Sequence, residues 1–119
     1  MTRAERVAEL LKREISDILK KKINDPRIGF TSITHVDVTN DLKYAKIYVS
    51  VYENEERKKS TIQGLNSAKG FIRGLIAPHL DLKFVPEIAF KLDTSIERAS
   101  KVFEIMHRLE REKKGKKKK

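Results

Sequence analysis

The residues best suited to binding chemistry lie in the segment Asn66-Ser67-Ala68-Lys69-Gly70. Apolar residues keep helical spacing on both sides of it, but Gly64, Gly70 and Gly74 interrupt the pattern, and a glycine inside a helix costs roughly 1 kcal/mol relative to alanine. We therefore expect two helices within residues 54–80 that meet at a kink. A helix that restarts at Gly70 presents backbone N–H groups and a positive dipole end beside Lys69 and Arg73, which suits a phosphate. The alternative is that the glycines only allow close helix–sheet packing.

A second candidate surface is one face of the alternating segment 44–52. Its outward positions include three tyrosines and a lysine, which are Tyr44, Lys46, Tyr48 and Tyr52. Aromatic side chains on an open sheet can stack with the bases of single-stranded RNA. Tyrosine is, however, also favoured in strands and on half-buried surfaces generally. A general single-stranded RNA-binding domain that uses this face is therefore our alternative hypothesis for the function.

Catalytic chemistry finds little support in the sequence. His35, His79 and His107 are isolated, and none has an i, i+4 partner of the metal-binding kind. No nucleophile-elbow, P-loop or dinucleotide-binding motif is present. The carboxylates lie among lysines and arginines, as is typical of surface ion pairs. We expect a protein that is not an enzyme, with no catalytic residue, no metal site and no cofactor.

The charge balance favours a polyanionic partner. The 119 residues are enough for one domain, and the net charge is +10. Six of the positive charges belong to the last seven residues, so the rest of the chain is only moderately basic. A basic arm attracts nucleic acid at long range, although many such termini only increase solubility.

The composition also limits the compartment. Cysteine is absent, which excludes disulfides and cysteine-ligated zinc. The N-terminal residues are amphipathic, unlike a signal peptide, and no stretch is long and apolar enough to span a bilayer. We expect a soluble, cytoplasmic monomer that does not contact a membrane.

The elements that position the candidate residues follow from hydrophobic periodicity. Residues 3–23 predict an amphipathic helix, which Asn24-Asp25-Pro26 terminates. Residues 28–38 and 44–52 predict an antiparallel hairpin, with the alternating apolar positions of the second strand facing a helix layer. Residues 85–93 predict a third strand, parallel to the first and beside it, because a helical crossover precedes it.

The last helix is expected from residue 94 to about 112. Its apolar stripe needs a partner surface, for which the tyrosine face of the sheet is one choice. The chain then divides into residues 1–93 as the binding domain, 94–112 as a C-terminal helical extension and 113–119 as a disordered lysine-rich tail.

This order of elements resembles a type II KH domain, an α+β fold with a three-stranded mixed sheet and helices on one face. KH proteins carry a Gly-X-X-Gly loop between the middle helices, and here Ala68-Lys69-Gly70 stands in its place. That substitution, together with several ordered segments, is similar to bacterial ribosome-binding factor A. The segments are Asn24-Asp25-Pro26-Arg27 before Gly29-Phe30, residues 36–45, Gly70-Phe71-Ile72-Arg73 and Val85-Pro86-Glu87-Ile88.

The resemblance implies an assembly factor that binds the small ribosomal subunit and its rRNA, assists late maturation and processing of that rRNA, and is linked to growth in the cold. It also implies release by a ribosome-associated GTPase. The shortened junction should suit phosphates of an already shaped RNA better than base-specific recognition of a short strand. The candidate RNA-binding residues are Ser67, Ala68, Lys69, Gly70 and Arg73, followed by Arg3, Arg6, Arg27, Lys43 and Lys46, each of which can also be an ordinary surface charge. A third hypothesis is a protein-interaction module whose last helix docks a partner.

Overall fold

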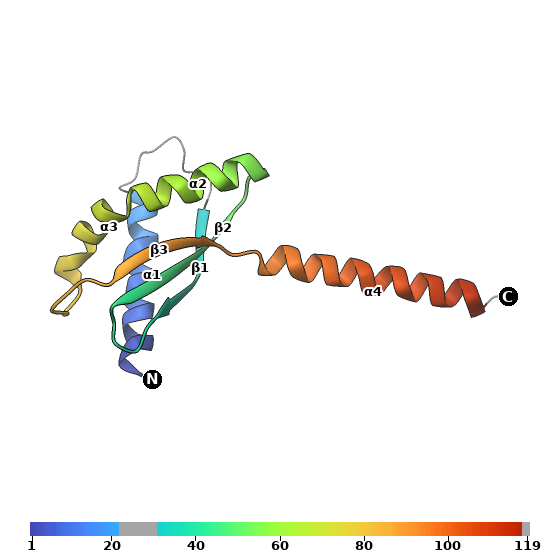
Figure 1. Ribbon diagram of the computed structural model, residues 1–119, viewed down its shortest axis with the longest axis horizontal. Helices are drawn as coiled ribbons and strands as arrows, with labels where there is room; N and C mark the ends of the chain where they lie inside the picture. Colours follow the sequence, from blue (N-terminus) through green and yellow to red (C-terminus); the bar gives the residue numbers. More distant parts are fainter. Residues whose placement is uncertain (22–30, 118–119) are drawn as a thin grey trace.

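The computed structural model describes residues 1–21 and 31–117. Arg27 and the predicted helix stop at residues 24–26 lie outside these ranges. The elements, in chain order, are α1 (Arg3–Lys21), β1 (Thr31–Val38), β2 (Tyr44–Val51), α2 (Glu55–Ser67), α3 (Lys69–Ile76), the short 3-10 helix η1 (Ala77–His79), β3 (Glu87–Leu92) and α4 (Ser95–Lys117). This is the predicted α+β order, with helices α1 to α3 gathered beside the sheet (Figure 1).

The core lies between the sheet and the layer formed by helices α1 to α3. Helix α1 begins where the Thr2 hydroxyl accepts a hydrogen bond from the Glu5 N–H at 3.1 Å, as its capping-box sequence predicts. The apolar stripe of α1 is buried, and so are the alternating apolar positions of β2. Helix α3 contributes Ile72 and Ile76, both fully buried, which closes the layer over the sheet. The predicted two-layer arrangement is therefore confirmed.

The order of the strands differs from the prediction. Strands β1 and β2 form the expected antiparallel hairpin, but β3 pairs in parallel with β2, so β2 is central and β1 is an edge strand. The prediction that β3 lies beside β1 is wrong. The α2–α3 crossover returns the chain to the strand it has just left, where Ala45 pairs with Ile88 and Ile47 with Phe90. This pairing joins two buried apolar rows, which explains why the adjacent position is preferred.

Helix α4 does not pack on the sheet. It extends away from the domain (Figure 1), and its described residues are exposed, including large apolar ones. The exposed apolar residues are Val102, Phe103, Ile105, Met106 and Leu109. The tyrosine face therefore remains open at Tyr44 and Tyr48, whereas at Tyr52 the first turns of α4 line a shallow pocket with it. Helix α4 also continues to Lys117, so residues 113–117 are helical where the sequence suggested a disordered tail.

Candidate nucleic-acid interface

The junction between α2 and α3 is a kink of one residue, Ala68. Its φ and ψ of −89° and 0° depart from helical geometry, and its N–H donates to the Gly64 and Leu65 carbonyl oxygens at 3.0 and 3.1 Å. Helix α3 then begins at Lys69, one residue before the predicted restart at Gly70. Among the residues that the structure describes, no side chain forms a capping hydrogen bond at this helix start. The two-helix prediction is thus confirmed.

The glycines of α3 face open space. A Cβ built on Gly70 or on Gly74 would meet nothing within 4 Å among the described residues, and neither glycine has a positive φ. Close packing and left-handed backbone therefore both fail to explain these two glycines. Ser67, Lys69 and Gly70 are exposed and Ala68 is partly exposed, so the junction forms a small-residue surface beside one lysine.

Arg73 is engaged by the protein itself. Its Nε donates to the Pro86 carbonyl oxygen at 3.0 Å and its Nη2 to the Val85 carbonyl oxygen at 2.9 Å. Its Nη1 also lies 3.5 Å from a Glu87 carboxylate oxygen. The guanidinium thus ties α3 to the segment that leads into β3. Arg73 therefore has a structural role in this geometry, whereas the sequence suggested a free phosphate contact.

A shallow hollow of about 520 Å³ lies beside Arg73. We call it the basic hollow, and its charged and aromatic lining residues are Arg3, Asp41, Lys43, Tyr44, Arg73, Lys83, Phe84 and Glu87. It unites three of the residues predicted from the sequence, Arg3, Lys43 and Arg73, which come from the first helix, the hairpin and α3. Four other candidates, Ser67 to Gly70, form the α2–α3 junction. Arg6 is exposed on α1 and Lys46 is exposed on the outer face of β2.

The hairpin turn holds Lys43 and Tyr44 at the rim of this hollow. Leu42 has a φ of 62°, an uncommon left-handed conformation for a non-glycine residue. The conformation is supported by the Asp41 carboxylate, which accepts from the Thr39 hydroxyl at 2.6 Å and from the Lys43 N–H at 3.0 Å. These hydrogen bonds, that of Thr39 first, lower the pKa of Asp41. The turn therefore has a defined geometry despite its exposure.

The basic hollow carries more positive than negative charge. Its cations are Arg3, Lys43, Arg73 and Lys83, and its carboxylates are Asp41, which accepts from the Lys43 N–H, and Glu87, which pairs with Arg73. Arg3, Lys43 and Lys83, by contrast, form no ion pair with any residue in the ranges 1–21 and 31–117. Sequence reasoning missed Lys83 and Phe84. The available signal was a lysine–aromatic pair between Pro78 and Pro86, in a segment with no helical or alternating pattern.

The outer face of the sheet is also open. Tyr44 and Lys46 are exposed on it, but Tyr48 is only partly exposed. The Tyr48 ring lies 6.0 Å from the His35 ring, centroid to centroid, and His35 Nε2 is 3.3 Å from an Asp37 carboxylate oxygen. Part of the aromatic surface is thus occupied by neighbours on β1.

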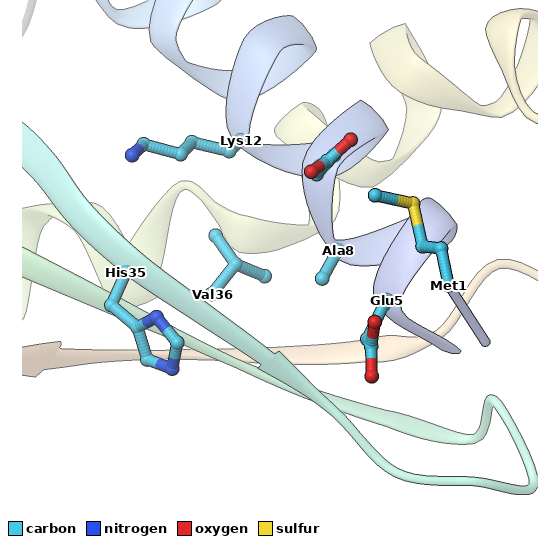
Figure 2. Close-up of a pocket in the computed structure, with 7 residues that line it drawn as sticks. Met1, Glu5, Ala8, Lys12, His35 and Val36 are labelled. Atoms are coloured by element: carbon cyan, nitrogen blue, oxygen red, sulfur yellow. The ribbon is translucent and has the colours of Figure 1, made fainter. Parts of the chain in front are cut away.

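A second hollow of about 280 Å³ separates α1 from the edge strand β1. Figure 2 shows Val36 pointing toward Ala8 of α1, with Met1, Glu5 and Lys12 also lining the hollow from the N-terminal region and the His35 ring on the other side of β1. The charges here are mixed, which offers a polyanion little net attraction. No group of three or more histidine, aspartate or glutamate side chains that could hold a metal ion occurs among the described residues. No helix in the described part of the chain is long and apolar enough to cross a membrane.

Comparison with known proteins gives a consistent result. The family model described as "Ribosome-binding factor A" matches residues 3–106. A protein of that name from Acetivibrio thermocellus is 48% identical over 118 residues, covering 98% of this chain and 96% of its own. Another from Dictyoglomus thermophilum is 52% identical over 101 residues, covering 84% of each chain.

Solved structures agree on the fold. The crystal structure of ribosome-binding factor A from Thermus thermophilus has a TM-score of 0.66 at 18% identity, covering 75% of this chain and 94% of its own. A solution NMR structure from Thermotoga maritima is 35% identical with a TM-score of 0.60, covering 79% of this chain and 86% of its own. The KH-like prediction is therefore confirmed. With a family model over most of its length and relatives near half identity, this chain belongs to the ribosome-binding factor A family.

Proposed function

We propose that this protein binds the small ribosomal subunit through the phosphates of its rRNA, and that it assists late maturation and processing of that rRNA. The observation that carries the proposal is the exposed α2–α3 junction, where Gly70 leaves backbone accessible beside Lys69. Family membership supports the choice of partner. A homology model of Thermus thermophilus ribosome-binding factor A, with a TM-score of 0.61 to this chain, has been fitted into a cryo-EM map of a complex of that protein with the 30S subunit.

The shape of the junction favours folded RNA over a short single strand. The Gly-X-X-Gly loop of a KH domain lets the backbone approach about four nucleotides. Here a one-residue kink replaces that loop, so less backbone is available for such a clamp. We infer that the junction and the basic hollow contact phosphates of rRNA already arranged by the subunit. Affinity for short isolated RNA should then be modest.

The remaining parts of the proposal concern the setting. The protein acts as a monomeric, non-catalytic binding factor in the cytoplasm, where its ribosomal partner is assembled. Release by a ribosome-associated GTPase belongs to the same proposal. It rests on the resemblance of the sequence to the family.

Co-sedimentation with purified small subunits tests the proposal. Lys69→Glu should weaken binding about 10-fold or more and reduce the slope of log K against log salt by about one unit, because a phosphate contact is lost. Lys59→Glu, an equal charge change at an exposed position in the middle of α2, is the matched control and should leave most binding intact. Deletion of the lysine-rich tail should change mainly the salt dependence. Equal losses in both glutamate variants would indicate general charge attraction and contradict a defined site.

One competing function has structural support. Tyr44 and Tyr48 on the outer face of the sheet are not covered by α4, as stacking of single-stranded RNA on these tyrosines requires. Tyr48→Ala should abolish RNA binding under this alternative, whereas Lys69→Glu should have little effect. Under our proposal the two variants behave in the opposite way.

A further inference from the structure

We propose that the basic hollow is a subsite for a single extruded nucleobase, which stacks on Phe84 while its flanking phosphates contact Arg3, Lys43 and Lys83. This inference rests on the proposed rRNA binding and adds a second contact point, separate from the α2–α3 junction. It assigns a role to the 80–86 segment, for which the sequence pattern suggested none.

The first observation is the exposure of two aromatic rings at one hollow. Phe84 is 76% exposed and Tyr44 is 59% exposed. Both line the same depression of about 520 Å³, Phe84 from the segment before β3 and Tyr44 from the start of β2. A phenyl ring so exposed contributes little to folding, and one beside a hollow offers a flat face to a planar ligand.

The second observation is the arrangement of charge around these rings. Lys83 Nζ lies 5.7 Å from the centroid of the Phe84 ring, in the geometry of a cation–π contact. Arg3 and Lys43 line the same hollow, and none of these three cations forms an ion pair with a residue in the described ranges, although the Asp41 and Glu87 carboxylates also line it. Aromatic rings interleaved with unpaired cations are the combination that single-stranded nucleic acid requires, since bases stack and phosphates need positive charge.

The third observation is that hydrogen bonds to backbone groups hold the segments lining the basic hollow in place. Arg73 fixes the Val85 and Pro86 carbonyl oxygens, and the Glu87 N–H donates to the Lys43 carbonyl oxygen at 2.8 Å. The two sides of the hollow are therefore joined by hydrogen bonds. Such preorganisation reduces the ordering cost of binding.

A nucleobase fits this hollow better than a protein side chain does. An acidic peptide would use the cations but would leave the exposed rings without a planar partner. An apolar protein surface would bury the rings but would also bury three cations without counter-charges, which is costly. RNA supplies both a planar ring and negative charge within one nucleotide.

The test combines affinity with a fluorescent reporter at position 84. Phe84→Ala should weaken binding to small subunits about 5- to 150-fold, the range for loss of one stacked base, without changing the salt slope. Phe84→Tyr should restore most of the affinity. The chain has no tryptophan. Phe84→Trp therefore introduces a single reporter, whose emission should be quenched when small subunits bind.

Phe103 provides the matched control, because it is 70% exposed but lies on α4, away from the hollow. Phe103→Ala should bind nearly as the wild type does, and Phe103→Trp should show no comparable quenching. Wild-type affinity in Phe84→Ala, or an equal loss in Phe103→Ala, would overturn the subsite. A blue shift of the residue-84 reporter without quenching would place protein there and would also overturn it. If the wild type itself fails to sediment with small subunits, the proposed function fails independently of Phe84.

Discussion

Gly70 and Gly74 occupy one short helix, and both would accept a Cβ without contact to any described residue. Because glycine in a helix loses more backbone entropy than alanine does, Gly74→Ala should raise the free energy of unfolding by about 1 kcal/mol. Gly70→Ala should also stabilise the fold but should weaken binding to small subunits, because its methyl group enters the junction surface. Urea unfolding and co-sedimentation measure the two effects. If Gly70→Ala binds like Gly74→Ala, close approach of RNA at residue 70 is excluded.

Asp93 is a second residue whose behaviour can be predicted from its contacts. It accepts hydrogen bonds from the Ser95 N–H at 2.9 Å and from the Thr34 hydroxyl at 2.6 Å. Bonds from Ser95 and then Thr34, with a smaller effect of the Arg98 charge, lower the pKa of Asp93 from 3.8 to about 2. A carboxyl group with a depressed pKa stabilises the fold above its unfolded value and loses this contribution as the pH falls.

We therefore expect stability to decrease as the pH is lowered from about 4 to about 2, in part because Asp93 becomes protonated. Asp93→Asn should reduce the steepness of the decrease in this window. Urea midpoints measured between pH 2 and 7 test this, and a carboxyl titration by NMR locates the pKa directly. An unchanged pH profile in Asp93→Asn would assign the acid sensitivity to other carboxylates.

At the scale of elements, a polar connection joins α3 to the segment before β3. Arg73 makes it through two carbonyl oxygens, at 2.9 and 3.0 Å. Arg73→Ala should lower the free energy of unfolding by about 2 kcal/mol, since hydrogen bonds from a charged donor to partly buried acceptors are lost. Arg73→Lys keeps the charge but lacks the planar fork, so it should recover less than half of the loss. Full recovery of stability by lysine would show that charge alone is sufficient.

The elements themselves were largely predictable from the sequence, whereas the way they combine was less so. The α1 stripe, the alternation in β2 and the glycine-interrupted helix pair each appear as local periodicity, and the structure confirms them. The neighbour of β3 depends on non-local pairing of buried rows, which periodicity does not specify. The structural role of Arg73 is also non-local, since its carbonyl partners lie more than ten residues away along the chain. The sequence therefore predicts Arg73 only as a phosphate contact. Phe84 was overlooked because an exposed aromatic residue has no periodic signature.

At the scale of the whole molecule, the candidate contacts are distributed over one compact domain, and α4 is a separate arm. The base of the arm is fixed, since Lys58 Nζ lies 3.0 Å from a Glu97 carboxylate oxygen and the Asp93 N–H donates to the Val49 carbonyl oxygen at 2.7 Å. Beyond this base, the described residues of α4 add no buried side chain to the core. The fold should therefore depend little on the arm.

The extended arm gives the molecule a measurable shape. The Cα radius of gyration is 18.9 Å and the longest extent is 69 Å, whereas a compact chain of this length would have a radius of about 13 Å. Small-angle X-ray scattering should give a radius near the larger value, and deletion of residues 96–119 should lower it to about 12 Å. The deletion should change the urea midpoint only slightly, because the core is intact. A full-length radius close to 13 Å would mean that the arm folds back on the domain, and the tyrosine face would then be its natural partner.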